Sequence, residues 1–306
     1  MRRRRELKVE AGDGTLLYAR QTWVPGADAT PLICANGIGV STIFWHYLED
    51  HFAPTRPVIC FDYRGHGESE APRDFDRLTI EENARDTIRV LDAFGHERAI
   101  FLGHSMGCQV IYTCAYQDPE RVAGLVPCLG ALGAPVHTFL DREMVSLISF
   151  VISYRVGLAI PDVVTAVKLR LMNSPRGRQI TSWLARKAGL VHPTRMPQAD
   201  LDAYLDHFAA LSPVVFLRMA ENMATHSAEP RAHDIHQPTL VAAGERDLFT
   251  PFYLSEEVAD LLPNADLFVF REGSHAAIVE QPRALHGAIE RFIEEHALDA
   301  SPVAAG

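Results

Sequence analysis

The chain has 306 residues, which suits one large domain or a domain that carries an insertion. Apolar residues make up 47% of it and charged residues 22%, the composition of an ordinary soluble globular protein. The formal net charge of −10 argues against nucleic acid as a main partner.

The first residues and the cysteines indicate the compartment. The arginine run at 2–5 is followed by residues 6–10, which lack the apolar segment of a signal peptide, so we expect a solvated terminus. The five cysteines are odd in number, lie in apolar segments and form no C-x-x-C motif, so they do not indicate a disulfide framework. Together these features predict a cytoplasmic protein.

Predicted strands and helices alternate through the first third of the chain. Gly12, Asp13 and Gly14 form a strong turn signal, which predicts an antiparallel hairpin between 8–9 and 15–23. Short continuous apolar runs predict buried strands, and apolar residues at helical spacing predict helices. We expect strands at 31–35, 58–61, 99–102 and 122–126, and helices at 42–51 and at 80–95, the second after a capping box at Thr79 and Glu82.

The pattern changes near Gly133, and from there to about Ala228 it predicts helices separated by prolines. Strand character returns at 239–243 and 266–270, and a helix that begins at Pro282 closes the chain. Alternating strands and helices form a mostly parallel, doubly wound sheet, and an insertion between two strands lies over their carboxyl ends. We therefore predict an α/β fold whose core comprises residues 1–132 and 229–306, with a helical cap formed by 133–228.

Two segments raise other possibilities. Residues 144–160 are largely apolar, but this stretch is shorter than the ~20 residues of a membrane span and contains Arg155. That favours a buried or substrate-facing helix over stable membrane insertion. His233 and His236 form an H-x-x-H pair with no further ligand types beside it, so we expect a loop there and no metal site. The sequence indicates no cofactor.

The most informative motif is Gly-His-Ser-Met-Gly at 103–107. It follows the apolar run 99–102 and opens the apolar stretch 108–116, so a strand, a sharp turn and a helix follow one another. A G-x-S-x-G turn in this setting is the nucleophile elbow of serine hydrolases, and it leaves room only for glycine at Gly103 and Gly107. We therefore expect Ser105 to be a nucleophile, the alternative being a chance match. Cys108 lies too far into the helix to replace it.

A serine hydroxyl needs a base within hydrogen-bond reach, and a carboxylate must in turn hold that base in the right tautomer. Histidine suits the role of base because its pKa lies near working pH. His275 follows the strand at 266–270, and Asp247 follows the strand at 239–243. We expect them to serve as base and acid. Taken singly, each could be an ordinary loop residue, and Glu245 is the nearest rival acid.

Acyl transfer also needs backbone N–H groups that stabilise the developing oxyanion. The amide of Met106, directly after the nucleophile, is one candidate. The amide of Ile38, in the glycine-rich loop 36–39 after the strand at 31–35, is the other. The alternative for this loop is a turn without such a role.

With these features the chain resembles the α/β-hydrolase family, and especially its capped esterase and lipase-like members. The matching motifs are Gly-His-Ser-Met-Gly at 103–107, Asp-Tyr-Arg-Gly-His-Gly-Glu-Ser at 62–69, Gly-Glu-Arg-Asp at 244–247 and Gly-Ser-His at 273–275. The order serine, acid, histidine is that of the fold. The resemblance implies that Asp62 and His66 are structural, and His104 is expected to pack or hydrogen-bond locally.

One departure from the family concerns the oxyanion loop. Many relatives carry His-Gly there, whereas this chain has Asn36 and Gly37, so the loop's side-chain hydrogen bonds must differ.

The leading hypothesis is a serine hydrolase that cleaves carboxylic esters through an acyl-enzyme, with a small-molecule ester that has an apolar portion as its substrate. The same residues allow cleavage of a lactone, thioester, amide or carbon–carbon bond, or perhydrolysis. A non-catalytic small-molecule receptor on the same scaffold is the hypothesis from another class. The sequence leaves the oligomeric state open.

Overall fold

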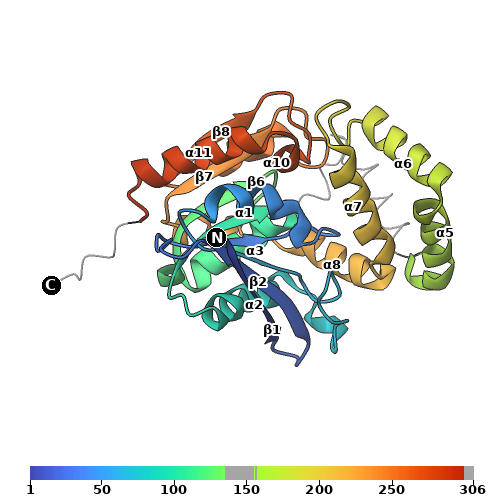
Figure 1. The fold of residues 1–306 in the computed structure, drawn as a ribbon, viewed down its shortest axis with the longest axis horizontal. Coiled ribbons are helices and arrows are strands. Elements are labelled where there is room, and N and C mark those ends of the chain that lie inside the picture. Colours follow the sequence, from blue (N-terminus) through green and yellow to red (C-terminus); the bar gives the residue numbers. More distant parts are fainter. Residues whose placement is uncertain (135–154, 156, 300–306) are drawn as a thin grey trace.

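The computed structural model describes residues 1–134, 155 and 157–299, and an eight-stranded sheet forms its centre (Figure 1). The strand order is β1-β2-β4-β3-β5-β6-β7-β8. Both pairings of β2 are antiparallel and the other neighbours run parallel, which confirms the predicted mostly parallel α/β sheet. The strands are β1 (Arg3–Glu10), β2 (Leu16–Trp23), β3 (Leu32–Ala35), β4 (Val58–Phe61), β5 (Ala99–His104), β6 (Val122–Cys128), β7 (Thr239–Gly244) and β8 (Ala265–Phe270).

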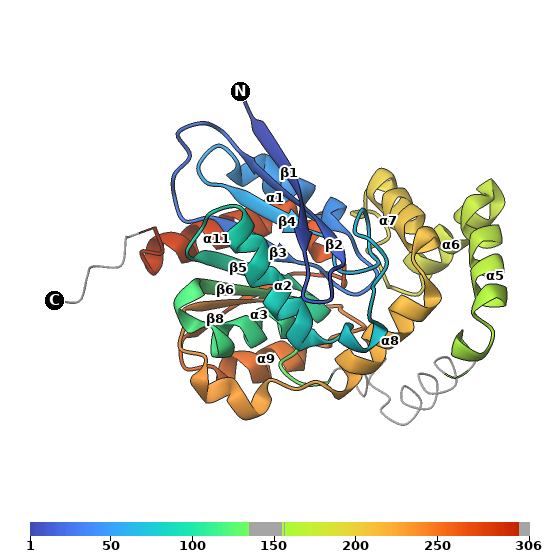
Figure 2. The same ribbon diagram turned by 90° about the horizontal axis from the view of Figure 1, so that it is seen from below.

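Helices cover both faces of this sheet (Figure 2). Successive residues of a strand point to opposite faces, so Ile33 packs with α2 (Ile80–Ala93) and α3 (Met106–Gln117), while Leu32 packs with α1 (His46–Phe52) and α11 (Pro282–Glu295). The Thr79 hydroxyl accepts a hydrogen bond from the Glu82 amide at 3.1 Å, as a capping residue should. Burial on both faces explains why the strands are continuous apolar runs.

The remaining helices of the core are short. They are the 3-10 helices η1 (Thr42–Trp45), η2 (Phe75–Arg77), η3 (Pro119–Arg121) and η6 (Glu229–Asp234), and the α-helices α9 (Phe252–Leu261) and α10 (Ala277–Glu280). The sequence analysis did not predict α9 or α10.

The arginine run at the N-terminus is exposed, as predicted, but its backbone is ordered in β1. Arg3 pairs with Trp23 of β2 and Arg5 pairs with Gln21. The strand extends this far because the β2 backbone offers hydrogen-bond partners, whatever side chains project from the edge.

Among the described residues, four α-helices lie between β6 and β7 in the chain, namely α5 (Pro161–Asn173), α6 (Pro175–Lys187), α7 (Gln198–Ala210) and α8 (Pro213–Thr225). Figures 1 and 2 show them together beside the sheet. The division into a core and a cap at 133–228 stays a prediction, and the helix expected over 144–160 lies mostly outside the described residues. Within the described part of the chain, no helix has both the length and the hydropathy of a membrane span.

The two ends of this helical segment are fastened to α3 by one buried side chain. The amide Nε2 of Gln109 lies within hydrogen-bond distance of the carbonyl oxygens of Gly133 at 3.0 Å, Met223 at 3.2 Å and His226 at 3.1 Å. The backbone amide of Ala228 also donates to the Leu132 carbonyl at 2.9 Å. The base of the segment is therefore tied to the helix that begins beside Ser105.

Candidate active site

Ser105 stands at a sharp turn between β5 and α3. Its backbone has φ 54° and ψ −118°, a conformation that costs energy for a residue with a side chain. The Ser105 amide donates to the Cys128 carbonyl at 3.0 Å, and its own carbonyl accepts from the Cys108 amide at 2.9 Å. These bonds to β6 and α3 hold the strained turn in place.

The glycines on either side of the turn leave room for its close approach to neighbouring backbone. A Cβ on Gly103 would lie 2.5 Å from the Gly107 oxygen, and a Cβ on Gly107 would overlap the carbonyl oxygen of Ala35. Real side chains do not tolerate such contacts with rigid backbone, so the prediction that only glycine fits at both positions is confirmed.

Three side chains from distant parts of the chain meet at this turn. His275 Nε2 lies 2.9 Å from Ser105 Oγ, and His275 Nδ1 lies 2.8 Å from Asp247 Oδ2. A carboxylate only accepts hydrogen bonds, so Nδ1 carries the proton, and Nε2 is then the acceptor for the serine hydroxyl. The structure thus brings together the serine, histidine and aspartate that the sequence analysis singled out.

Asp247 is buried and fully bonded. Its Oδ1 accepts from the amides of Phe249 at 2.8 Å and Thr250 at 3.0 Å, and its Oδ2 accepts from the Thr250 hydroxyl at 2.8 Å as well as from His275. Burial opposes ionisation, but His275 and the Thr250 bonds outweigh it and lower the pKa of this carboxyl.

The rival acid, Glu245, is exposed and faces elsewhere. Its Oε2 accepts from the backbone amide of Glu272 at 2.7 Å. Of the two acids that follow β7, the one in contact with His275 is therefore Asp247.

His104 was expected to pack or hydrogen-bond locally; its side chain is buried against the ring of His275, and its hydrogen bond joins it to a residue far along the chain. Its Nε2 donates to the carbonyl oxygen of His275 at 2.9 Å, across 171 positions of sequence. Burial, with the neighbouring His275, lowers the pKa of His104 to about 3, so the ring stays neutral at ordinary pH. Sequence patterns carry no signal for this contact.

Glu280 of α10 is a second residue that the sequence analysis missed. Its Oε1 accepts from the Ser274 hydroxyl at 2.8 Å and from the backbone amide of His192, in the loop between α6 and α7, at 2.5 Å. Glu280 thus ties the residue before His275 to the helical segment.

The predicted oxyanion loop, residues 36–39 after β3, is held by buried side chains. Asn36 donates from Nδ2 to the Phe61 carbonyl at 2.8 Å and accepts on Oδ1 from Trp45 Nε1 at 2.7 Å. The Gly39 amide donates to Nε2 of His66 at 3.3 Å. Among the described residues, the amides of Ile38 and Met106 have no hydrogen-bond acceptor. Both remain available for a ligand.

Loop 62–69 forms the support beneath the oxyanion loop. Asp62 accepts from the amides of Thr42 at 2.8 Å and Glu68 at 3.0 Å, and burial raises its pKa. His66 donates from Nδ1 to the Arg64 carbonyl at 3.1 Å, and burial lowers its pKa to about 4. These bonds agree with the structural role that the family resemblance implies for Asp62 and His66.

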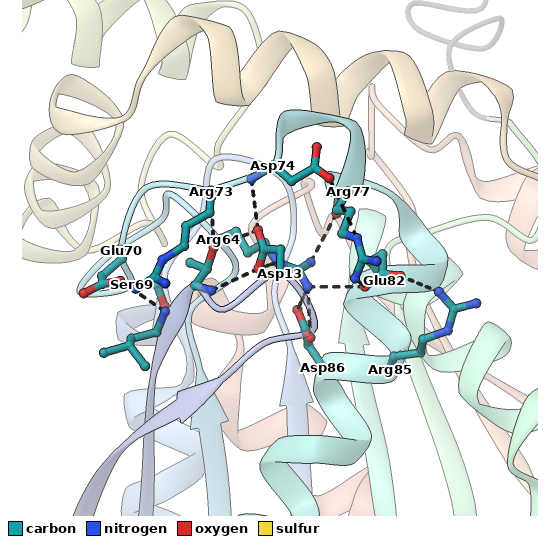
Figure 3. Close-up of polar contacts among 12 residues, drawn as sticks. Asp13, Arg64, Ser69, Glu70, Arg73, Asp74, Arg77, Glu82, Arg85 and Asp86 are labelled. Carbon is teal, nitrogen blue, oxygen red and sulfur yellow. Dashed lines mark hydrogen bonds and ion pairs between the residues drawn. The ribbon is translucent and has the colours of Figure 1, made fainter.

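Arg64 anchors this support in a buried ion-pair network (Figure 3). Its guanidinium, fully buried, lies 3.2 Å from Asp13, 3.4 Å from Glu82 and 2.9 Å from Asp86. Burial raises the pKa of Asp86 to about 6 although two arginines contact it. The network joins the β1–β2 turn, loop 62–69 and α2.

Aromatic side chains of α7 and α8 lie over the oxyanion loop. A Cβ on Gly39 would lie 3.2 Å from Phe216 and 3.3 Å from Phe208. The ring of Tyr204 lies 5.8 Å from that of Phe44, and Phe249 lies 4.8 Å from the imidazole of His275. The surroundings of Ser105 are therefore rich in apolar surface.

Comparisons with known proteins agree with this fold. A family model described as "Alpha/beta hydrolase family" matches residues 32–288. A protein of Azorhizobium caulinodans, described as "Putative carbamate hydrolase RutD", is 30% identical over 288 residues, which is 94% of this chain and 98% of the relative. A protein of Caulobacter segnis with the same description is 25% identical over 280 residues, 91% of this chain and 96% of the relative.

Two solved structures show the same fold. The enol-lactonase from Burkholderia xenovorans LB400 superposes with a TM-score of 0.72 at 23% identity, covering 95% of this chain and all of the other. A thermophilic esterase from Thermogutta terrifontis superposes with a TM-score of 0.73 at 19% identity, covering 97% of this chain and 100% of the other.

Proposed function

The chain belongs to the alpha/beta hydrolase family and is a hydrolase, and from that premise we propose that it cleaves carboxylic esters with Ser105 as nucleophile. The observation that carries the proposal is the continuous chain of hydrogen bonds from Ser105 Oγ through His275 to Asp247. Each hydrogen bond in this chain runs in the direction that nucleophilic catalysis by serine requires.

In the proposed acylation step, His275 Nε2 removes the proton of Ser105 as Oγ attacks the ester carbonyl carbon. Asp247 holds the imidazole and stabilises the imidazolium that forms. The amides of Ile38 and Met106 donate to the tetrahedral oxyanion. Met106 lies at the N-terminal end of α3, where the helix dipole also favours negative charge. The C–O bond to the alcohol then breaks, and His275 returns the proton to the departing oxygen.

Deacylation repeats these roles with water. His275 takes a proton from a water molecule that attacks the acyl carbon, the oxyanion forms again at the same two amides, and the bond to Ser105 Oγ breaks. The acid leaves, and the proton returns to Ser105. The strained turn at Ser105 supports this cycle because it keeps Oγ at one position throughout.

The substrate is proposed to carry an apolar portion. Support comes from Phe208 and Phe216, which lie against Gly39 beside the proposed oxyanion amides, and from Phe249, which lies against His275. Aromatic side chains bind apolar groups by surface burial and dispersion.

Carbamate cleavage is the second candidate function, because the relatives of 25–30% identity carry the description "Putative carbamate hydrolase RutD". The same geometry would let Ser105 attack a carbamate carbonyl and His275 protonate the departing nitrogen or oxygen.

The test is a substrate panel with purified protein. It contains nitrophenyl esters of several chain lengths and aryl carbamates, assayed with wild type, Ser105→Ala and Ser227→Ala. Ser227 is an exposed serine far along the chain, and its replacement serves as the matched control. We expect ester turnover in wild type and in Ser227→Ala, and loss to near background in Ser105→Ala. Turnover of carbamates but of no ester selects the second candidate.

A fluorophosphonate probe separates an enzyme from a receptor. Peptide mapping should find the label on Ser105 in wild type. A folded protein that takes up no label and turns over no substrate would contradict the catalytic proposal.

A further inference from the structure

Helices α5 and α6 carry a group of exposed apolar side chains that the proposed chemistry does not use. Their exposed fractions lie between 45% and 58%, far above those of core residues. They are Ile160, Val163, Val167 and Leu171 on or beside α5, and Ile180, Trp183 and Leu184 on α6. We call this group the α5–α6 patch.

The members of the patch share one face of each helix. Residues 160, 163, 167 and 171 follow one another at steps of three and four, and residues 183 and 184 lie three and four positions after 180, so each set forms a stripe along its helix. Solvent-exposed apolar stripes of this kind mark a surface that binds a membrane or another protein.

The patch lies at the outer margin of the molecule. Figures 1 and 2 show α5 and α6 beyond α7 and α8, on the side away from the C-terminus. α5 packs against α6 and α7, so the apolar stripes project from a helical layer that the rest of the fold supports.

Cations surround the patch, although the whole chain is acidic. Residues 161–187 contain six lysines and arginines and one acidic residue, Asp162, against a net charge of −10 for the chain. Arg176 and Lys187 lie one turn before and one turn after the apolar residues of α6, on the same face, and Arg170 adjoins Leu171. All three are exposed and have no ion pair within the described part of the chain.

We propose that the α5–α6 patch docks the protein on the surface of a bilayer that contains anionic phospholipid. Apolar side chains with Trp183 among them would enter the interfacial layer, while Arg170, Arg176 and Lys187 reach the phosphates. Like charges would face one another if two copies met through this patch, so its charge favours an anionic surface over a second copy. The proposal does not rest on the reaction assigned to Ser105.

The test uses vesicles of phosphatidylglycerol mixed with phosphatidylcholine, and vesicles of phosphatidylcholine alone. Wild type should bind the anionic vesicles more tightly, and high salt should weaken that binding. Replacing Arg170 and Arg176 by Gln should lower the partition coefficient by about 30-fold, at about fivefold for each cation removed. The matched control replaces Arg283 and Arg291, two exposed arginines of α11, and should leave binding unchanged.

Apolar insertion has its own readout. Trp183 is the most exposed of the three tryptophans, so vesicle binding should shift its fluorescence to shorter wavelength. The shift should vanish in Trp183→Phe, which still binds. Trp183→Ala should bind more weakly, whereas Leu261→Ala, at an exposed leucine of α9, should not. All of these positions are exposed, and circular dichroism checks that each variant folds.

Three results would overturn the proposal. One is equal binding of wild type and of the variant lacking Arg170 and Arg176. Another is the absence of any binding to anionic vesicles at low salt. The last is a concentration-dependent dimer, seen by light scattering, that Trp183→Ala dissociates, because the patch would then serve a second copy of the chain.

Discussion

The exchange Asp247→Asn isolates the electrostatic part of the site, because Asn has nearly the same shape as Asp. Oδ1 accepts from two backbone amides, those of Phe249 and Thr250, and only the side-chain oxygen of Asn can occupy that position. The Asn amide nitrogen must then take the place of Oδ2, next to His275 Nδ1 and the Thr250 hydroxyl. There it is a donor where the wild type has an acceptor.

This reversal changes the tautomer of His275. With an N–H directed at Nδ1, the neutral imidazole carries its proton on Nε2 and can no longer accept the proton of Ser105. The imidazolium also loses its carboxylate partner in the transition state. We expect kcat to fall by about 10³–10⁴-fold, the effect of an incorrect tautomer in sites of this type, which equals about 4–5.5 kcal/mol of transition-state stabilisation.

The assay compares kcat for a nitrophenyl ester in wild type, Asp247→Asn and Glu245→Gln. Glu245 follows the same strand but bonds to the Glu272 amide, so its variant is the matched control and should stay within about twofold of wild type. Urea unfolding of all three variants checks that the fold survives. If Asp247→Asn keeps wild-type kcat, or if Glu245→Gln loses as much, the assignment of Asp247 is wrong.

The other predictions concern residues that hold the site. In His104→Leu the His275 carbonyl loses its donor, so we expect kcat to fall by about tenfold with KM unchanged, whereas His104→Gln, which can donate to the same oxygen, should recover most of it. Arg64→Met leaves three carboxylates buried together, and urea unfolding should show a loss of about 3–5 kcal/mol. That loss should be larger at pH 8 than at pH 5, because the pKa of Asp86, already raised to about 6, rises further without its cation. Gly107→Ala should abolish folding or activity because its Cβ overlaps the Ala35 carbonyl. At Gly287 of α11 a Cβ would meet only Arg291 Nη1 at 3.6 Å, so Gly287→Ala should raise the free energy of unfolding by about 0.5–1 kcal/mol in the same urea assay. A decrease in that free energy would contradict the steric argument.

Features set by local sequence could be predicted. The nucleophile turn is determined within five residues by two glycines and the strand and helix on either side, and its steric cause is the one found. The core strands were recognised as apolar runs because parallel strands are buried on both faces. β1 was predicted at only two residues because the arginines that extend it show no apolar alternation.

Features set by distant contacts could not be predicted. His104 bonds to a residue 171 positions away, and Glu280 bonds to one 88 positions away. Neither residue type indicates its partner, since a buried histidine or glutamate will bond to any backbone group that the fold brings near. Helix α9 is a different case: Leu254, Val258 and Leu261 lie at steps of four and three, an apolar periodicity that the sequence analysis did not use.

The two buried histidines next to the site must both be neutral for its geometry to persist. His66 accepts the Gly39 amide on Nε2, which a protonated ring could not do. The Nδ1 of His104 has no partner among the described residues, and a proton there would bury an unpaired donor beside Gly37. Burial lowers the pKa of His66 to about 4 and that of His104 to about 3, so both rings stay neutral down to that range.

The same lowered pKa values affect the stability of the fold at a higher pH than the pH at which either folded histidine becomes charged. Below pH 6.5 these two histidines bind protons in the unfolded chain, whereas in the folded chain they stay neutral down to about pH 4 and pH 3. The free energy of unfolding therefore falls as the pH drops through that interval. The residues that keep the oxyanion loop and His275 in position therefore also favour unfolding in acid.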